Sequence, residues 1–555
     1  MPLQFQGLWA TRSSYKKTIR AGGLTFTNQI NQKMMSISPL FLGTLSVLSF
    51  PALALIVGYT IYVLTSQGDE KTVPKSYPIV GLLFSFLRNR NRLPEWLTEL
   101  LEHAPSNTIT FQRLGTKVVI TADPRNVEHL LKTRFENYPK GNYFMLRLHD
   151  LLGSGIFNAD GEAWKLQRRV ASYEFGTNSL RDFITESVQG EITQRLLPLL
   201  RKAAATKQSG LDMQDVFQRF AFDNICKVAF GMDPGCLDIS LPLSEFAESF
   251  EVATNLSLKR FTDPLPFLWM LKRMFNVGSE KRLRQAIHII HNFAQDVIDA
   301  RKKEIFHSRG AQRQDLLSRF LFTHESAVAA GKASYVFSVR DIVISFILAG
   351  RDSTSAALTW FFWLLSSHPR VEQNIYAEIT SLVAAREESS SCFSYEELKQ
   401  MKYLQATLCE SMRLYPPVPS DTKQALAEDE LPDGTVVRKG MRVIYHPYAM
   451  GRMESVWGTD CLEFKPERWL SKMENGSLEF VAHNAFKYPV FQAGPRVCLG
   501  KQTAFIQMKS ITASVIEEFS LEVDRNWNPK YVAMITAKME NGLPVRVVKR
   551  LQKVP

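Results

Sequence analysis

Cys498 constrains this chain more than any other residue, because of the ten residues in which it lies. They run from Phe491 to Gly500, with Arg496 two positions before the cysteine. Gly494 permits a tight backbone turn and a close approach to a flat macrocycle, and the residues from Gly500 onward are predicted to form a helix. A thiol at a helix N-terminus is stabilised as its anion by the helix dipole and by free N–H groups. The pattern therefore predicts a thiolate that ligates haem iron, a ligand that favours oxygenase chemistry.

The other five cysteines are interpreted as small buried hydrophobic residues, a common role for a free cysteine. They are Cys226, Cys236, Cys392, Cys409 and Cys461. Their scattered spacing argues against a secreted disulfide framework and against a zinc site. We therefore expect the catalytic part of the chain to face a reducing compartment.

The residues around Cys498 resemble the signature of the cytochrome P-450 superfamily, Phe-x-x-Gly-x-Arg-x-Cys-x-Gly. Every defined position of that signature is matched, by Phe491, Gly494, Arg496, Cys498 and Gly500. The resemblance implies haem b as cofactor, with Cys498 as the axial ligand of its iron. It also implies a mainly α-helical fold with small β-sheets.

Trp164 and Arg168 resemble the Trp-x-x-x-Arg helix of the same family. Side chains four residues apart lie on one face of a helix. The resemblance implies that Arg168 and Arg496 pair with the haem propionates, since a guanidinium matches a carboxylate geometrically, and that Trp164 can donate one N–H. Without this context, the two residues would be read as an ordinary half-buried pair.

The segment Asp341–Ser367 is predicted to be an apolar helix with Ala349–Thr354 at its centre. An acid and hydroxyls in such a helix are costly unless they are satisfied or functional, and the hydroxyls can also bond the backbone and bend the helix. The family resemblance implies a groove for O₂, in which an acid–alcohol pair delivers protons. That alcohol is usually Thr, whereas Ser353 follows Asp352 here. We predict Asp352 and Ser353 as the relay, with Thr354 able to take the serine's place.

Glu410 and Arg413 lie three residues apart on a predicted helix, which alone is a common surface pattern. Followed by Leu414–Pro419, however, the pair resembles the family's Glu-x-x-Arg helix. The segment Phe464–Trp469 likewise resembles the stretch whose arginine, Arg468, completes a triad with that pair. The implied role of the three residues is structural, namely to hold the core around the cysteine loop.

Outside these motifs the chain is predicted to be mostly helical, with four short strands in hairpin-like spacing. The strands are expected at Thr108–Gln112, Lys117–Thr121, Thr435–Val437 and Arg442–Tyr445. Apolar residues predicted to line a substrate pocket are Phe346, Ile347, Ala349, Val418, Met534 and Ile535. Any hydrophobic core would use the same residue types.

Three stretches resemble the plant fatty-acid ω-hydroxylase clan, namely Ala349–Leu364, Leu431–Thr435 and Tyr448–Met453, and Tyr488–Arg496 is similar to its branch that includes jasmonoyl-isoleucine hydroxylases. The resemblance implies hydroxylation of the terminal carbon of a fatty acid or similar aliphatic chain. O₂ and electrons from NADPH, passed on by NADPH-cytochrome P-450 reductase, would serve the reaction. Three alternatives stay open: a jasmonoyl-isoleucine 12-hydroxylase, a sterol side-chain (C26) hydroxylase, and, outside this class, a non-catalytic membrane haem-binding protein.

The stretch Leu40–Leu64 contains no charged residue and is long enough to cross a bilayer as a helix. We expect a transmembrane anchor at 35–65, a proline-rich hinge at 66–81 and the haem-thiolate monooxygenase domain at 82–555. The expected location is the endoplasmic reticulum membrane, with a single span and the catalytic domain in the cytosol.

Residues 1–34 are basic and contain no acid, as in a transit peptide. They would also place positive charge on the lumenal side, against the positive-inside rule. Either they target the chain to a plastid or mitochondrial membrane, or they are an upstream extension and the true start is Met34 or Met35. We favour the second interpretation, because it removes the charge conflict.

The chain carries a formal net charge of +12. A basic chain can bind nucleic acid, but no basic run alternates with aromatic residues and no nucleic-acid module is recognisable. We therefore expect the partners to be a lipid bilayer, an acidic redox protein and a hydrophobic small-molecule substrate, with no nucleic acid.

Overall fold

The computed structural model describes residues 82–113, 116–175, 178–206, 210–238, 245–263, 265, 267–307, 315–329, 337–386 and 392–550. The predicted extension (1–34), anchor (35–65) and hinge (66–81) lie outside these residues. Within the described part of the chain, no helix has both the length and the apolar composition that a membrane span requires. The fold is therefore that of the predicted catalytic domain.

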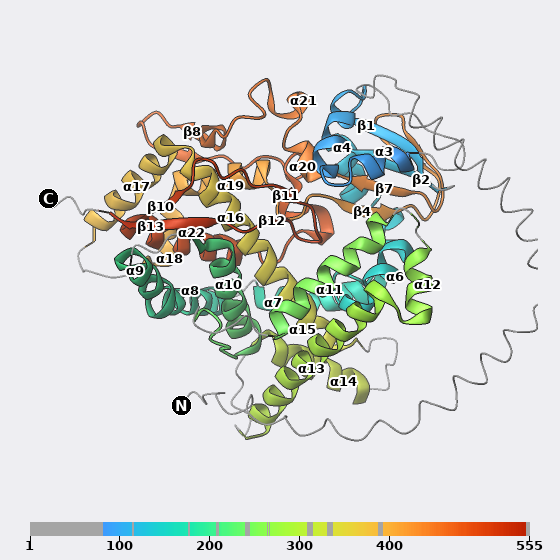
Figure 1. The fold of residues 1–555 in the computed structure, drawn as a ribbon, viewed down its shortest axis with the longest axis horizontal. Coiled ribbons are helices and arrows are strands. Elements are labelled where there is room, and N and C mark those ends of the chain that lie inside the picture. The colour runs from blue at the N-terminus through green and yellow to red at the C-terminus, as the bar shows by residue number, and fades with distance from the viewer. Residues whose placement is uncertain are drawn as a thin grey trace, which may run out of the picture. The chain divides into compact units, whose positions relative to one another are not determined.

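This part of the chain is mainly helical with small sheets, as predicted (Figure 1). The α-helices are α3 (Leu83–Arg88), α4 (Leu93–Glu102), α5 (Pro124–Glu128), α6 (Gly141–Leu152), α7 (Gly161–Phe175), α8 (Asn178–Glu191), α9 (Leu197–Ala205), α10 (Met213–Phe230), α11 (Glu245–Thr262), α12 (Leu268–Phe275), α13 (Gly278–His307), α14 (Leu316–Ala329), α15 (Val339–Ile347), α16 (Ser353–Ser366), α17 (Pro369–Ala384), α18 (Tyr395–Gln400), α19 (Lys402–Leu414), α20 (Pro447–Met450), α21 (Glu454–Trp457) and α22 (Lys501–Glu518). Short π and 3-10 turns are η2 (His129–Thr133), η3 (Phe135–Asn137), η4 (Ile192–Leu196), η6 (Leu348–Asp352), η7 (Pro466–Trp469), η8 (Pro489–Phe491) and η9 (Gly494–Arg496).

The largest sheet has four strands in the order β1-β2-β7-β4. These strands are β1 (Thr108–Arg113), β2 (Thr116–Thr121), β7 (Arg442–Tyr445) and β4 (Asp421–Gln424). The hairpin β1–β2 was expected from the hairpin-like spacing of its two strands. The parallel pairing of β2 with β7, in which Val119 faces Val443, joins segments far apart in the sequence. Both valines are completely buried, so this pairing anchors the sheet in the core.

The remaining strands form two- and three-stranded sheets. They are β3 (Leu211–Asp212), β5 (Asp429–Glu430), β6 (Val436–Val437), β8 (Leu470–Lys472), β9 (Leu478–Phe480), β10 (Phe519–Val523), β11 (Tyr531–Val532), β12 (Lys538–Met539) and β13 (Pro544–Lys549). The strand predicted at Thr435–Val437 is β6, which pairs with β5. The antiparallel pair β11–β12 carries the loop with Met534 and Ile535, so these two pocket candidates lie on a hairpin tip.

The helix predicted at Asp341–Ser367 is present as α15, the π turn η6 and α16 in unbroken succession. It contacts α10, α19 and α22 and runs through the middle of the helical body (Figure 1). Nearly every side chain of α16 is buried, as expected for a helix that is apolar on all sides. Trp360 at its centre stacks on Tyr415, with the rings parallel and 4.1 Å apart. A rigid central helix therefore carries the predicted acid and hydroxyls.

Candidate active site

Cys498 lies between two short turns and a long helix. η8 and η9 precede it, and α22 begins at Lys501 with Gly500 as its N-cap. The Cys498 N–H donates a hydrogen bond to the Phe491 carbonyl at 2.8 Å, which closes the loop on itself. The Phe491 ring packs against the ring of Phe505 in α22, with the ring centroids 5.2 Å apart. The loop is thus fixed against the helix that follows it.

The surroundings of the Cys498 thiol act in opposite directions on its charge. The residue reaches solvent, yet burial of the sulfur raises the pKa of the thiol, while the Gly500 N–H, Arg168 and Lys501 lower it. The expected stabilisation by the helix N-terminus is present, but burial outweighs it. A bound metal ion deprotonates a coordinating thiol outright, so the burial does not oppose ligation.

Gly494 is required by a close contact between the cysteine loop and the backbone of η2. Its φ is +63°, and a Cβ there would overlap the carbonyl oxygen of Leu131 in η2. The close approach that demands glycine here is between two backbone segments, while the approach of the loop to a macrocycle stays a prediction. The glycine sets how tightly the cysteine loop packs against η2.

Trp164, Arg168 and Arg496 lie together beside the cysteine loop. Arg496 Nη2 donates to Asp160 Oδ1 at 2.7 Å and to the Ala159 carbonyl at 2.9 Å. Its guanidinium carbon lies 4.4 Å from the centroid of the Trp164 ring, a cation–π contact. Arg168 is half-buried, and within the described residues it has no ion pair or hydrogen bond. Arg496 is thus held in place by Asp160 and Trp164, whereas Arg168 has no anionic partner among the described residues.

Lys423 on β4 is a further buried cation, which the sequence analysis missed. Its side chain is fully buried, and no described residue forms a hydrogen bond with its Nζ. The nearest acid, Asp421, lies 3.5 Å away and is already held by Lys140 at 2.5 Å. The pKa of Lys423 is lowered to about 7, mainly by burial and also by the charges of Lys140 and Arg496, while Asp421 raises it. A lysine inside a short strand gives no sequence signal, because its burial depends on the strands around it.

These groups fit haem, which combines a metal with two carboxylates. Cys498 offers a sulfur ligand, and Arg168 lacks an anionic partner on the same side of the loop. A cation in a half-buried position is costly without an anion, and a guanidinium binds a carboxylate with two parallel hydrogen bonds. Cys498 would hold the iron, while Arg168 and Arg496 would hold the propionates.

The π turn η6 places Asp352 and Ser353 at the centre of the long helix. Ser353 Oγ donates to the Ala349 carbonyl at 2.6 Å, a backbone bond that such a helix break permits. A Cβ on Gly350 would overlap Ile225 of α10, so α10 presses closely on the turn. π turns occur frequently at functional sites. The serine hydroxyl is adjacent to the acid but is engaged with the backbone.

Asp352 is a poorly solvated carboxylate. Its side chain is 17% exposed, and its Oδ1 lies 3.5 Å from Arg351 Nη1. Burial raises the pKa of Asp352, and the charge of Arg351 lowers it. Thr354, the predicted substitute for Ser353, is buried on α16. Perturbed pKa values of this kind are common among residues of functional sites, which suits the predicted relay.

Glu410, Arg413 and Arg468 are brought together as the resemblance implied. Glu410 and Arg413 are fully buried, with Arg413 Nη2 2.7 Å from Glu410 Oε1, and Arg468 Nε lies 3.4 Å from the same oxygen. Trp469, which the sequence analysis did not single out, donates its Nε1–H to Glu410 Oε2 at 2.8 Å. Arg413 also donates to the Cys461 carbonyl at 2.5 Å. The group ties α19 to the segment that leads to the cysteine loop.

The pocket candidates separate into two groups. Phe346 and Ile347 are buried in the core, with 7% and 0% exposure, so Ile347 does not line an open cavity and is corrected to a core residue. Ala349, Val418 and Ile535 are half-buried. Met534 lines a small cavity together with Asp352, so this candidate shares a cavity with the acid of the predicted relay.

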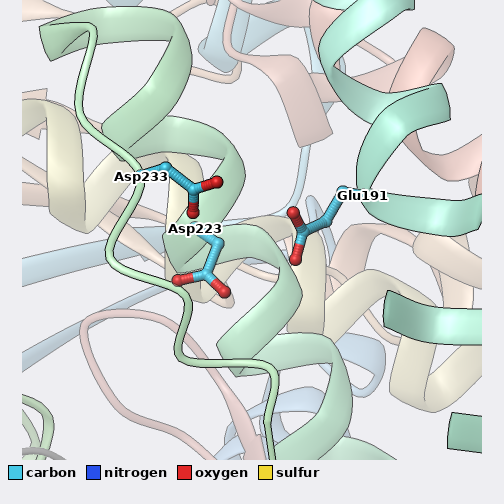
Figure 2. A group of neighbouring side chains, drawn as sticks. All are labelled: Glu191, Asp223 and Asp233. Carbon is cyan, nitrogen blue, oxygen red and sulfur yellow. The ribbon is translucent and has the colours of Figure 1, made fainter. Parts of the chain in front are cut away.

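An acidic cluster is formed by Glu191 at the end of α8, Asp223 in α10 and Asp233 in the loop after α10. One oxygen atom of each carboxylate lies within 4.8 Å of the others, and Glu191 faces the other two from a separate helix (Figure 2). Arg195 enters this cluster, with Nη1 2.7 Å from Glu191 Oε2 and 2.9 Å from Asp233 Oδ1. Asp223 accepts the backbone N–H groups of residues 236 and 237. Because an arginine occupies the cluster, we interpret it as an ion-pair network that fastens the loop after α10.

The sequence matches known proteins over most of its length. The model of the family "Cytochrome P450" matches residues 72–539. Cytochrome P450 94A1 of Vicia sativa is 48% identical over 483 residues, which cover 86% of this chain and 91% of that protein. Cytochrome P450 94B1 of Arabidopsis thaliana is 46% identical over 517 residues, or 92% and 98%. Cytochrome P450 86B1 of the same plant is 42% identical over 489 residues, or 85% of each.

Proposed function

The chain belongs to the cytochrome P450 family and is a monooxygenase; from that premise we propose that it hydroxylates the terminal (ω) carbon of a fatty acid or similar aliphatic chain. The observation that carries this proposal is an apolar wall between the cysteine loop and the central helix. Such a wall suits a long hydrocarbon, since burying each methylene contributes about 0.8 kcal/mol.

The apolar wall consists of Phe175, Phe346, Leu499 and Ile535, which pack in one cluster. A Cβ placed on Gly500 would lie 3.9 Å from Cε1 of Phe175 and 4.0 Å from the Cys498 sulfur, so both side chains lie beside this glycine. The Phe175 ring stacks on Phe346 of α15, with centroids 6.1 Å apart. An aliphatic chain held against this wall would be positioned close to the haem that Cys498 would hold, and such positioning decides which carbon reacts.

When bound, haem supplies the activation of O₂ and the insertion of one oxygen atom into the substrate. Cys498 would hold its iron, and the cations Arg168 and Arg496 would hold its propionates. Trp164 contributes a flat surface that keeps Arg496 in place. The protein thereby sets the position and the electrostatics of the group, while the group supplies the chemistry.

Asp352 is proposed as the residue that holds the proton for the reaction. Burial raises the pKa of its carboxyl group, which is the direction that favours a proton donor. Ser353 Oγ, whose hydrogen bonds to Ala349 O, has free lone pairs that can accept from a donor. Passing a proton onward through Ser353 requires that its hydroxyl rotate away from the Ala349 carbonyl. Thr354 is the neighbouring hydroxyl that could take its place.

We further propose that NADPH-cytochrome P-450 reductase supplies the electrons and that the chain works at the endoplasmic reticulum membrane with its catalytic domain in the cytosol. The uncharged sequence stretch Leu40–Leu64 supports a single membrane span. Protease digestion of sealed microsomes should then remove the catalytic domain. Protection of that domain from the protease would contradict the proposed orientation.

A competition assay tests the substrate. Membranes that carry the protein and a plant reductase receive NADPH and an equimolar mixture of fatty acids, jasmonoyl-isoleucine and a hydroxysterol. Mass spectrometry then identifies the hydroxylated products and the positions of their new hydroxyl groups. We expect ω-hydroxy fatty acids as the main products. Fatty acids oxidised only within the chain would refute terminal hydroxylation, and a dominant jasmonoyl-isoleucine or sterol product would refute the fatty-acid assignment.

The matched control replaces the ligand of the iron. Cys498→Ser should abolish both the haem-thiolate absorption spectrum and product formation, because serine cannot supply a thiolate. Cys409→Ser alters a buried cysteine on α19, and it should leave the spectrum intact. Product formation that survived Cys498→Ser would contradict the monooxygenase assignment and favour a non-catalytic binding protein.

A further inference from the structure

A small cavity of about 30 Å³ lies on one side of the π turn. It is bounded by side chains of α10, α11, the central helix and the β11–β12 hairpin. Asp352 and Arg351 form its wall on the helix, and Met534 and Lys538 form its wall on the hairpin. A polar cavity of this size has room for at least one water molecule. A water molecule in this cavity can therefore contact Asp352.

Side-chain exposure shows which end of the cavity faces solvent. Arg351 is 6% exposed and Asp352 17%, whereas Lys538 is 29% and Glu251 47% exposed. Lys538 Nζ lies 2.6 Å from Glu251 Oε1. This ion pair joins α11 to β12 at the outer end of the cavity. The cavity thus leads from a buried carboxylate to an exposed ion pair.

The same charged residues act on Asp352. Burial raises the pKa of Asp352, Arg351 and Lys538 lower it, and Glu251 raises it. Arg351 belongs to the central helix, Glu251 to α11 and Lys538 to β12, while α10 presents two uncharged glutamines to the cavity. Because Glu251 pairs with Lys538, it governs how strongly the lysine's charge acts on Asp352.

We propose that this cavity is the route by which protons from solvent reach Asp352, and that Glu251 and Lys538 form its outer gate. The inference rests on the proposed role of Asp352 as proton donor, since an acid that gives up a proton must regain one. On its other side the Ser353 hydroxyl is committed to the Ala349 carbonyl. In one transfer Asp352 takes a proton from a cavity water, and that water regains one from solvent by way of Glu251. No electron moves.

The first test follows the protonation of Asp352 in the substrate-free protein with haem bound. Infrared spectroscopy measures the carbonyl-stretch band of protonated carboxyl groups as a function of pH, and the Asp352 band is the one lost in Asp352→Asn. Lys538→Met should raise the midpoint and Glu251→Gln should lower it, each by roughly 0.5–1 pH unit, or about three- to tenfold in the dissociation constant. Lys538→Arg, which keeps the charge, should stay close to the wild type. Unchanged midpoints in both charge variants would overturn the proposal.

The second test follows proton delivery during NADPH consumption. In both charge variants we expect a solvent deuterium isotope effect larger than in the wild type and about two- to fivefold more hydrogen peroxide released per NADPH. The matched control is Lys530→Met, since Lys530 pairs with Glu540 on the same hairpin, 3.5 Å away and exposed, and does not line the cavity. Isotope effects equal to that control would also overturn the proposal. Neither readout requires a fatty-acid product, so failure of the substrate assignment would be seen separately.

Discussion

Glu410 and Arg413 form an ion pair one helical turn apart in which neither side chain is exposed to solvent. Two hydrogen bonds of 2.7 and 2.8 Å join them. The arginine also donates to the carbonyl groups of Cys461 and Glu463. A buried pair of this kind stabilises a fold only while both charges remain, so this one is a sensitive point of the scaffold.

Removing one charge of this pair should be strongly destabilising. Glu410→Gln leaves Arg413 buried and uncompensated, and we expect the free energy of unfolding to fall by about 3–5 kcal/mol, with loss of haem. Urea denaturation and the haem-to-protein ratio measure both effects. The control is Lys402→Met, which breaks the exposed pair with Glu479 and should cost about 0–1 kcal/mol. Equal effects of the two substitutions would contradict the structural role.

Arg168 should matter for holding haem rather than for folding. The side chain has no anionic partner among the described residues, so Arg168→Met removes only the pairing with a propionate. A hydrogen bond to a charged group contributes about 1.5–3 kcal/mol, which predicts haem loss about 10- to 100-fold faster. Transfer of haem to an excess of apomyoglobin measures this rate. Arg169→Met, at the exposed neighbouring position, should leave the rate unchanged, and an equal rate in both variants would count against the assignment.

The sequence predicted those features that depend on local pattern. The hairpin β1–β2, the long central helix and the helix after Cys498 all lie where periodicity and turn residues placed them. Contacts between distant segments were not predictable in this way. Lys423 is buried because β4 pairs with β7, and Gly494 is required because its loop meets Leu131. Nothing in the sequence around Lys423 or Gly494 indicates the contacts that the fold gives these residues.

Ser353 offers a test of coupling between electron flow and product. Its hydroxyl bonds to the Ala349 carbonyl, and serine lacks the methyl group that restricts the rotamer of threonine. We expect Ser353→Thr to lower the hydrogen peroxide released per NADPH by about twofold, because the hydroxyl is held in fewer orientations. Parallel measurement of NADPH consumption and peroxide checks this. Peroxide release equal to that of the wild type would show that the rotamer is not what limits coupling.

Glu191 should make the stability of the fold depend on pH. The pKa of Glu191 is raised to about 8, mainly by burial and also by the charge of Asp223, against the opposing effect of Arg195. An unfolded glutamate titrates near ~4.3. Between these values the folded protein holds a proton that the unfolded chain has lost, so the free energy of unfolding falls as the pH rises.

Glu191→Gln removes this titration while keeping an oxygen for Arg195. The variant should therefore show a flatter pH dependence and, at pH 8, an unfolding free energy about 1–2 kcal/mol above that of the wild type. Urea denaturation at a series of pH values between about 5 and 8 measures both quantities. Glu186→Gln changes an exposed acid on the same helix, α8, and should leave the slope as it is. If Glu191→Gln also kept the wild-type slope, the acidic cluster would be ionised throughout, and Arg195 would then outweigh the burial of its carboxylates.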